Sequence, residues 1–298
     1  MKLKKFFNSQ KVAPYVFVLP FILSFAVFWI YPLFSTVKMS FEKILPSKTT
    51  FVALANYEKL LNDRIFHIAI GNSFWYMVWT IIILIPLPMI FACIMDSNLV
   101  KAKGLWKALL YLPALSSVVV SGMLFRLMFS ELPTSQMNVF LQWLGQLPIK
   151  WLKQESTARF ALVLLATWRW TGVNMLYYIA GLKNIDKAYY EAAEIDGAGA
   201  FQRFRYITLP LLKPTNIYVL TISIYAGLSM FLESFMLWAG NSSPRNIGLT
   251  IVGYLYRRGI EKNELGYASA VGLVLLVIAL IINIIQLILN GSFKKEEA

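Results

Sequence analysis

The sequence predicts an all-α, polytopic integral membrane protein with six transmembrane helices. Of its 298 residues, 58% are hydrophobic and only 14% are charged, whereas soluble globular proteins have about 45–50% apolar and about 25% charged residues. The sequence also contains six separate, mostly apolar runs, each longer than the roughly 20 residues that a transmembrane helix needs. These two observations exclude an ordinary soluble enzyme and a disordered chain.

The first apolar run is expected to be an uncleaved transmembrane span. It is longer than the apolar region of a signal peptide, and no Ala-x-Ala-like cleavage site follows it. Several runs contain proline, which membrane helices tolerate when neighbouring groups satisfy the carbonyl that proline leaves unpaired. No separate soluble region interrupts the runs, so residues 1–298 are expected to form a single transmembrane domain. The predicted spans, in order, are Pro14–Thr36, Asn72–Met95, Ala108–Phe129, Ala158–Ala180, Thr215–Trp238 and Gly266–Leu289.

The distribution of basic residues predicts that both termini are cytoplasmic. An even number of spans puts the two ends on one side of the membrane. With the ends inside, the internal segments carry 14 Lys and Arg residues and the longer external segments carry 11, in the direction of the positive-inside rule. No basic run with interleaved aromatics is present, so the net charge of +13 indicates loops near anionic lipid and no nucleic-acid surface. The clearest contributions come from Lys2, Lys4, Lys5, Lys11, Lys294 and Lys295.

The internal segment between the fourth and fifth spans, residues 181–214, predicts a helical hairpin at the cytoplasmic surface. Asp186 is expected to cap its first helix, because an aspartate oxygen accepts from the free N–H groups of a helix start. Glycine accepts positive φ, so the two glycines between the helices are expected to allow a sharp reversal. Its mixed apolar and charged surface suits a cleft on a cytoplasmic protein, and equally suits a helix that rests on lipid headgroups. The expected elements are a helix over 187–196, a turn at Gly197 and Gly199, and a helix over 200–209.

The same segment carries a family motif. Glu191-Ala192-Ala193, Gly197, Ile207 and Leu209-Pro210 stand at the spacing of the EAA motif, and the chain therefore resembles the permease subunits of binding-protein-dependent ABC importers. Further matches to the carbohydrate class, which includes the maltose, sn-glycerol-3-phosphate and oligosaccharide permeases, cover most of the chain. Within that class the sequence is most similar to permeases of the arabino-oligosaccharide type. These further matches are Pro14-Tyr15 to Pro32, Asn56-Tyr57, Asn72-Ser73, Tyr111-Leu112-Pro113 and Gly266 to Ala270.

The resemblance implies a type I ABC importer permease fold in a bacterial cytoplasmic membrane. The chain is then one half of the translocation pore of an ATP-driven sugar importer, with an oligosaccharide as the expected substrate. The implied partners are a second homologous permease, a cytoplasmic ATPase dimer, an extracellular sugar-binding (lipo)protein and membrane lipid. Because the sequence has no GxxxxGK[ST] phosphate loop, ATP is expected to bind to the partner subunits. We expect no cofactor in this chain and no enzymatic chemistry on the sugar.

The physical character of the EAA residues fits the coupling role that the resemblance implies. Glu191 is a carboxylate suited to an Arg or Lys in an ATPase groove. The two alanines that follow it keep one helix face thin for close approach. Gly197 permits the bend, and Leu209-Pro210 is expected to end the docking element and set its angle to the fifth span.

Arg169 in the fourth predicted span and Glu233 in the fifth are candidate functional residues, because charges inside a membrane are costly and usually serve a function. Two interpretations remain open: a pore-lining pair that contacts sugar hydroxyls, or an Arg–Glu brace that fixes helix packing. Sugars bind through hydrogen bonds and aromatic faces. The other candidate sugar contacts are therefore Trp168, Trp170, Asn174, Tyr225 and Ser229.

The sequence offers no catalytic or metal-binding constellation. His67 is the one histidine and Cys93 the one cysteine, so neither a His/Cys metal cluster nor a Cys–His dyad is expected. The alternative function is a stand-alone secondary transporter or channel. Such carriers usually show inverted repeats or acidic relays, and Glu233 alone is thin support for one.

Overall fold

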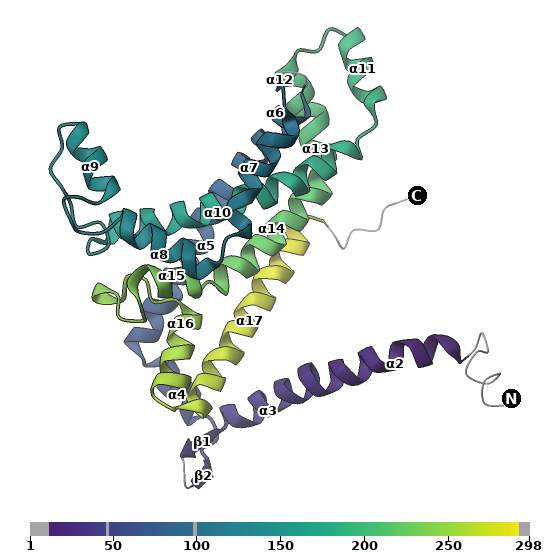
Figure 1. The fold of residues 1–298 in the computed structure, drawn as a ribbon. Helices are drawn as coiled ribbons and strands as arrows, with labels where there is room; N and C mark the ends of the chain where they lie inside the picture. The colour runs from purple at the N-terminus through teal and green to yellow at the C-terminus, as the bar shows by residue number, and fades with distance from the viewer. Residues whose placement is uncertain (1–11, 46–47, 98–99, 292–298) are drawn as a thin grey trace, which may run out of the picture. The chain divides into compact units, whose positions relative to one another are not determined.

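The computed structural model describes residues 12–45, 48–97 and 100–291. Within these ranges the chain is helical apart from loops and one two-stranded hairpin (Figure 1). The predicted topology depends most clearly on basic residues near the two termini. These residues lie outside the described ranges: Lys2, Lys4, Lys5, Lys11, Lys294 and Lys295.

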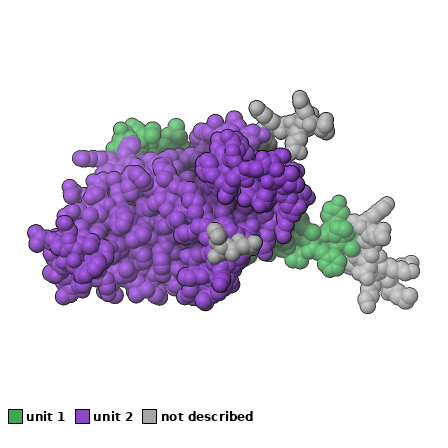
Figure 2. All heavy atoms as spheres, turned by 90° about the horizontal axis from the view of Figure 1, so that it is seen from above, with its two compact units in different colours: residues 1–63, 255–274 green, residues 64–254, 275–298 purple. Residues whose placement is uncertain are grey.

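The chain divides into two compact units, which Figure 2 colours separately. Unit 1 comprises residues 1–63 and 255–274, and unit 2 comprises residues 64–254 and 275–298. The last long helix, α17 (Leu265–Leu289), contributes to both. The expectation of one domain over residues 1–298 stays a prediction.

Unit 1 begins with a long apolar helical rod. Its helices α2 and α3 are joined without a break by the wider π-helical turn η1. This turn ends at Ile30, two residues before Pro32 in the first turn of α3. A hairpin follows, in which β1 pairs antiparallel with β2 from Glu42 opposite Phe51 to Leu45 opposite Lys48. The remaining elements of unit 1 are helical. In order they are α2 (Ala13–Phe25), η1 (Ala26–Ile30), α3 (Tyr31–Ser40), β1 (Glu42–Leu45), β2 (Lys48–Phe51), α4 (Ala55–Leu61) and η4 (Arg257–Glu261).

Ion pairs join the two sequence segments of unit 1, and the pair between Arg258 and Asp63 is the most buried of them. Arg258 binds Asp63 at 2.6 Å and also Glu264 at 3.3 Å, and the Tyr267 hydroxyl donates to the same Asp63 carboxylate. Lys59 approaches Glu264 at 3.4 Å. Positive and negative charges balance within this cluster, which reduces the cost of burying each of them.

Unit 2 contains most of the helices of the described chain. Its elements are α5 (Arg64–Leu84), α6 (Pro86–Asp96), α7 (Lys103–Leu115), α8 (Val118–Met128), α9 (Gln136–Trp143), α10 (Glu155–Lys183), α11 (Lys187–Ile195), α12 (Ala200–Arg203), η2 (Phe204–Thr208), α13 (Leu209–Leu211), α14 (Lys213–Leu228), α15 (Leu232–Trp238), η3 (Pro244–Asn246) and α16 (Ile251–Tyr256).

The long helix α10 is the centre of unit 2. It packs against α5, α6, α7 and α14, and its buried face includes Leu165, Met175 and Tyr178. Gly172 allows the closest of these approaches, because a Cβ atom there would collide with the main-chain carbonyl of Leu110 in α7. Small residues at helix crossings let backbones approach in this way in membrane proteins.

Three helical segments are long and apolar enough to cross a membrane: Ala13–Ser40, Arg64–Asp96 and Leu265–Leu289. They match the first, second and sixth predicted spans. Two sharply bent pairs raise the number to five if each pair is one span, namely α7 with α8 and the Ala200–Leu211 segment with α14. The prediction of six spans is therefore supported only in part.

The third predicted span is not one continuous helix. It bends by 93° between α7 and α8, and serine side chains stabilise the bend. The Ser116 hydroxyl donates to the Pro113 carbonyl at 2.6 Å, and the Ser117 hydroxyl accepts from Val119 N–H. These local hydrogen bonds compete with the helical ladder, as serine side chains often do.

The fifth predicted span also differs from expectation. Its helix α14 stops at Leu228, and residues 229–231 separate it from the short helix α15. The Thr250 hydroxyl donates to the Met230 carbonyl at 2.7 Å, and the Ser229 hydroxyl donates to the Tyr225 carbonyl at 2.7 Å. The Thr250 bond comes from a distant part of unit 2, whereas the Ser229 bond is local to the end of α14. Because Thr250 supplies a donor to the Met230 carbonyl, the apolar sequence does not need to continue as a helix there.

Candidate functional site

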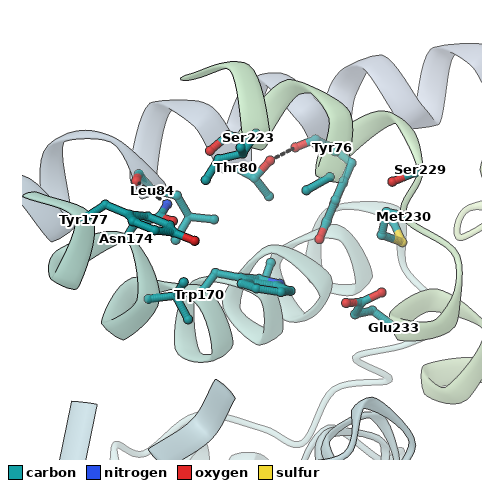
Figure 3. A pocket seen from close by; sticks show the side chains of 15 residues that line it. Tyr76, Thr80, Leu84, Trp170, Asn174, Tyr177, Ser223, Ser229, Met230 and Glu233 are labelled. Carbon is teal, nitrogen blue, oxygen red and sulfur yellow. Dashed lines mark hydrogen bonds between the residues drawn. The ribbon is translucent and has the colours of Figure 1, made fainter. Parts of the chain in front are cut away.

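A cavity of about 390 Å³ lies inside unit 2 beside the break that follows α14 (Figure 3). Helices α5, α10 and α14 supply its walls, and the start of α15 closes one side. Three aromatic rings, Tyr76, Trp170 and Tyr177, line it together with polar side chains from the same helices. The polar lining residues are Thr80, Asn174, Ser223, Ser229 and Glu233.

Tyr76, Trp170 and Glu233 face the same space from three different elements (Figure 3). Tyr76 is buried in α5, Trp170 is partly open in α10, and Glu233 opens α15. Aromatic faces beside hydroxyl, amide and carboxylate groups suit a ligand that has both apolar ring faces and many hydroxyls.

Arg169 and Glu233 form an ion pair, with 3.1 Å between Nη1 and Oε1. Both side chains are buried, with 9% and 13% of their surfaces exposed. The other terminal nitrogen of Arg169 lies 3.5 Å from the Ser116 carbonyl, at the bend between α7 and α8. One guanidinium on the continuous helix α10 therefore contacts both broken segments, at Ser116 and at the start of α15.

The ion pair has a cavity side and a packing side. Glu233 lines the cavity, whereas Arg169 lies behind it and is not part of the lining. The Nε of Arg169 is buried and has no hydrogen-bond partner within the described ranges. This arrangement combines the two sequence interpretations: Arg169 has the position of a brace, and Glu233 has the position of a lining residue.

Asn174 lines the cavity but is also a structural residue. Its Nδ2 donates to the Leu84 carbonyl at 2.9 Å. In a continuous helix that carbonyl would accept from the residue four positions later, which is Pro88 and has no N–H. Asn174 thus supplies the hydrogen bond that proline withholds at the junction of α5 and α6.

Of the seven predicted pore residues, four line the cavity and three do not. Trp170, Asn174, Ser229 and Glu233 are brought together. Arg169 stands behind the wall. Trp168 packs on Phe125 with 5.6 Å between ring centroids, and Tyr225 is exposed on α14, so neither belongs to the cavity lining.

Sequence reasoning missed Tyr76, Thr80 and Tyr177 as lining residues. The signal that points to the cavity is the pair Tyr76 and Thr80, which lie one helical turn apart and therefore share a face of α5. Polar groups on one face of an otherwise apolar span indicate a side turned toward the protein interior.

The predicted cytoplasmic hairpin is present as α11, a turn, and the helical run from α12 to α13. Asp186 caps α11 as expected, since its Oδ1 accepts from Ala188 N–H at 3.0 Å. Gly197 has φ +77° and makes the reversal. Gly199 does not take part as expected: its φ of −68° is ordinary, and it is the N-cap of α12.

Two contacts tie the halves of this hairpin together. The Tyr190 and Thr208 hydroxyls lie 2.9 Å apart, and Arg203 binds Glu194 at 3.1 Å. The helix that contains Pro210 ends one residue later, at Leu211, and the chain then bends by 66° into α14. The wide turn η2 before Pro210 accommodates the missing N–H.

The EAA residues lie on this hairpin with different exposures. Glu191 and Ala192 in α11 are exposed, and so are Gly197 and Pro210. Ala193, Ile207 and Leu209 are half-buried. Large apolar side chains project beside them, with Ile195 88% and Phe201 77% exposed. Exposed apolar residues gathered on one element indicate an interaction surface.

Within the described ranges, no group of three or more His, Cys, Asp or Glu side chains is placed to hold a metal ion. The cavity, the broken helices and the exposed hairpin are therefore the features that bear on function.

Residues 103–295 match the family described as "Binding-protein-dependent transport system inner membrane component". The chain belongs to this family. A member of the binding-protein-dependent transport family is a membrane-embedded transport component and not an enzyme.

Curated members of the family are similar along nearly the whole chain. The arabinooligosaccharides transport system permease protein AraP of Bacillus subtilis is 51% identical over 97% of this chain and 92% of its own length. The lactose transport system permease protein LacF of Rhizobium radiobacter is 31% identical, with 95% of each chain covered. The expected similarity to permeases of the arabino-oligosaccharide type is thus confirmed.

A solved structure supports the predicted permease fold of this transport family. A chain of a bacterial ABC transporter involved in the import of the acidic polysaccharide alginate superposes with a TM-score of 0.84 at 25% identity, covering 99% of this chain and 100% of that one. The type I ABC importer fold that the resemblance implied is therefore confirmed, although the number of spans is not.

Proposed function

We propose that this permease forms one half of the translocation pathway of an ATP-driven importer of oligosaccharides, with arabino-oligosaccharides as the substrate class. The 51% identity to AraP supports the substrate. The observation that carries the proposal is the cavity beside the broken helix α14, where Trp170 and Tyr76 face Glu233. Its volume of about 390 Å³ falls within the range of about 300–1,000 Å³ for small-molecule sites.

The cavity is the proposed sugar path. Discontinuous helices at membrane depth leave main-chain groups and polar side chains open to a ligand, and transporters bind substrates at such breaks. In this chain the residues proposed to contact sugar are Tyr76, Trp170, Ser229 and Glu233. Arg169 holds Glu233 in place, while Trp168 and Tyr225 face other surroundings.

The proposed topology keeps six spans with both termini in the cytoplasm. Helix α10 is the additional span, since 29 residues reach about 43 Å at 1.5 Å per residue. Its central charge, Arg169, is neutralised by Glu233, which removes the main objection to its lying inside a membrane. The bent pair α7–α8 makes one span, and α14 with α15 makes another.

The α11–α13 hairpin is proposed to couple the permease to a cytoplasmic ATPase. Glu191 is exposed on α11 and forms no ion pair within the described ranges, so its carboxylate is open to a basic partner residue. Ala192, Ala193 and Gly197 leave room for close approach, while Ile207, Leu209 and Pro210 anchor the second helix above α14. The apolar side chains of Ile195 and Phe201 supply the area that docking buries.

The partners follow from this role. We propose a second permease that completes the pathway, an ATPase dimer that binds ATP, and an extracellular sugar-binding protein that delivers the substrate. The permease itself then needs no cofactor, because the energy of ATP reaches it through the hairpin.

A charge reversal at Glu191 tests the coupling. We expect Glu191→Lys to abolish uptake while the chain still reaches the membrane, because a lysine repels the basic residue that the carboxylate contacts. Uptake and membrane abundance are measured together. The control is Glu58→Gln, which removes an exposed carboxylate in α4 and should leave uptake unchanged. Normal uptake by Glu191→Lys would remove the coupling role of this residue.

The substrate class is tested by complementation. This chain replaces AraP in Bacillus subtilis, and growth on arabinotriose is compared with growth on lactose and on glucose. Growth on arabinotriose that requires this chain supports the proposal. Loss of growth on arabinotriose, with normal membrane abundance of the chain and normal growth on glucose, contradicts it.

A further inference from the structure

A second cavity, of about 330 Å³, lies in unit 2 where the hairpin joins α14. Its walls come from η2, α13 and α14, with Asn290 directly after α17 and Ile85 at the junction of α5 and α6. It is separate from the proposed sugar cavity and shares no lining residue with it.

The cavity is polar at one end and aliphatic at the other. Lys213, Asn216, Ile217 and Leu220 all line it from α14, because residues three and four apart share a helix face. Leu220 lies about 10 Å along the helix from Lys213 at 1.5 Å per residue. The groove therefore runs from a cationic entrance to an apolar interior.

The cationic entrance is not neutralised within the described ranges. Arg205 and Lys213 line it and are both exposed, no acidic residue is part of the lining, and neither forms an ion pair there. The Arg205 guanidinium lies over the neighbouring Tyr206 ring, with 5.9 Å between Cζ and the ring centroid. Asn216 accepts from the Tyr178 hydroxyl through Oδ1, which leaves its Nδ2 as a further donor at this end.

We propose that this groove binds one anionic phospholipid. The phosphate lies between Arg205 and Lys213, and an acyl chain follows Ile217 and Leu220 into the apolar part. Basic pockets between membrane helices bind anionic headgroups in this way. A free phosphate would use only the cations, whereas a lipid also fills the aliphatic half of the groove, which favours the lipid.

The position of the groove gives the lipid a mechanical role. Arg205 and Leu209 lie before the 66° bend into α14, and Lys213 and Ile217 lie after it. A single lipid therefore contacts both sides of the joint between the hairpin and the membrane helix. The inference needs only that the chain is embedded in a membrane and does not depend on the substrate or on ATPase coupling.

Lipid binding to the purified full-length chain in detergent tests the proposal. Native mass spectrometry measures the affinity for phosphatidylglycerol, phosphatidylcholine and soluble glycerol phosphate. We expect phosphatidylglycerol to bind selectively and the R205Q/K213Q variant to bind it about 25-fold more weakly, since each basic residue near an anionic lipid is worth about fivefold. The matched control K101Q/R126Q removes the same charge from exposed positions elsewhere and should bind as the wild type does.

Three outcomes would overturn the proposal. Equal affinity for phosphatidylglycerol and phosphatidylcholine would mean that the cations select nothing. Equal losses in R205Q/K213Q and in the control would indicate a general charge effect, and glycerol phosphate binding as tightly as the lipid would remove the role of the aliphatic half. Thermal melting of each variant in the same detergent shows whether it is folded. The variant L220S keeps both cations and changes only the aliphatic half of the groove. It should weaken the binding of phosphatidylglycerol but not that of glycerol phosphate.

The carboxylates near the end of the sequence, Glu296 and Glu297, provide a last comparison. We expect E296Q/E297Q to bind phosphatidylglycerol with unchanged affinity. A different result would contradict the lipid site: E296Q/E297Q binding phosphatidylglycerol more tightly, by the same factor by which R205Q/K213Q binds it more weakly. It would mean that Arg205 and Lys213 pair with these carboxylates in the wild type. Because every measurement uses binding and not uptake, failure of this proposal leaves the proposed transport function untouched.

Discussion

Side chains donate to main-chain carbonyls at three interruptions of the membrane helices of this permease. Asn174 binds the carbonyl left free by Pro88, Thr250 binds the Met230 carbonyl after α14, and Ser116 binds the Pro113 carbonyl before α8. An unsatisfied main-chain group in a membrane costs several kcal/mol by the usual estimate of about 2–7 kcal/mol. Each of these polar residues therefore permits a break at a place where the apolar sequence alone would favour a continuous helix.

Asn174→Leu should lower the stability of the chain by about 1–3 kcal/mol, because it leaves the Leu84 carbonyl buried without a donor. Pro88→Ala restores an N–H at the position that can reach this carbonyl. We therefore expect the double variant Pro88→Ala with Asn174→Leu to be more stable than Asn174→Leu alone. Thermal melting in detergent measures both, and equal melting of the two variants would contradict the assigned role of Asn174.

The Arg169–Glu233 pair can be divided into its packing and cavity roles by charge reversal. Arg169→Glu alone should destabilise the chain by about 3–5 kcal/mol, since it leaves buried charge without compensation. Adding Glu233→Arg should recover much of the melting temperature but not uptake, because the carboxylate then no longer lines the cavity. Recovery of both stability and uptake would show that the pair is only a brace.

At the scale of elements, the stiffness of the hairpin comes from a few fixed points. Asp186 caps α11, Tyr190 and Arg203 join the two helices, and Gly197 makes the only left-handed turn between α11 and α12 in the described chain. A hairpin that transmits force must not bend within itself. In the proposed coupling role, motion would then be concentrated at the junctions of the hairpin with α10 and α14.

Alanine substitutions at the two hairpin glycines should differ in their effect on uptake. Gly197→Ala places a side chain at φ +77°, which costs about 1–2 kcal/mol in the left-handed region, and should reduce uptake. Gly199→Ala adds a methyl group at an ordinary φ with its nearest neighbour at 3.7 Å, and should leave uptake near the wild-type value. Uptake assays on membranes with matched protein levels compare them, and equal effects would contradict the role of Gly197 in the turn.

On the scale of the whole molecule, the proposed topology makes the coupling hairpin and both termini cytoplasmic. Loops before α10 and after α15 are then external. This arrangement places the lipid groove in the inner leaflet, where anionic lipid attracts basic residues.

The single cysteine allows a direct test of this topology. In a Cys93→Ser background, Leu147→Cys in the loop before α10 should react with a membrane-impermeant maleimide in intact spheroplasts, since Leu147 is 83% exposed. Lys101→Cys, between α6 and α7, should react only after permeabilisation. The reverse pattern would invert the orientation, and labelling of both sites in intact spheroplasts would change the number of spans between them.

The three apolar segments and the hairpin follow directly from local sequence. Hydropathy and capping act within one or a few helical turns, so local sequence predicts Ala13–Ser40, Arg64–Asp96, Leu265–Leu289 and the Asp186-capped helix. The strand pair β1–β2 was not foreseen. Its residues carry no strong alternation, and pairing depends on a partner rather than on one segment's own pattern.

The sequence by itself determined that this chain is a helical membrane protein and where its hairpin begins, because hydropathy and helix capping depend on residue type and spacing. That the chain is a permease followed from its EAA motif, through the resemblance to a known family. Only the tertiary structure decided where α8 and α15 break from their spans, and which side chains share the cavity. Those outcomes depend on donors such as Asn174 and Thr250, which come from distant positions and act on another helix. No local pattern can show which carbonyl a distant side chain will reach.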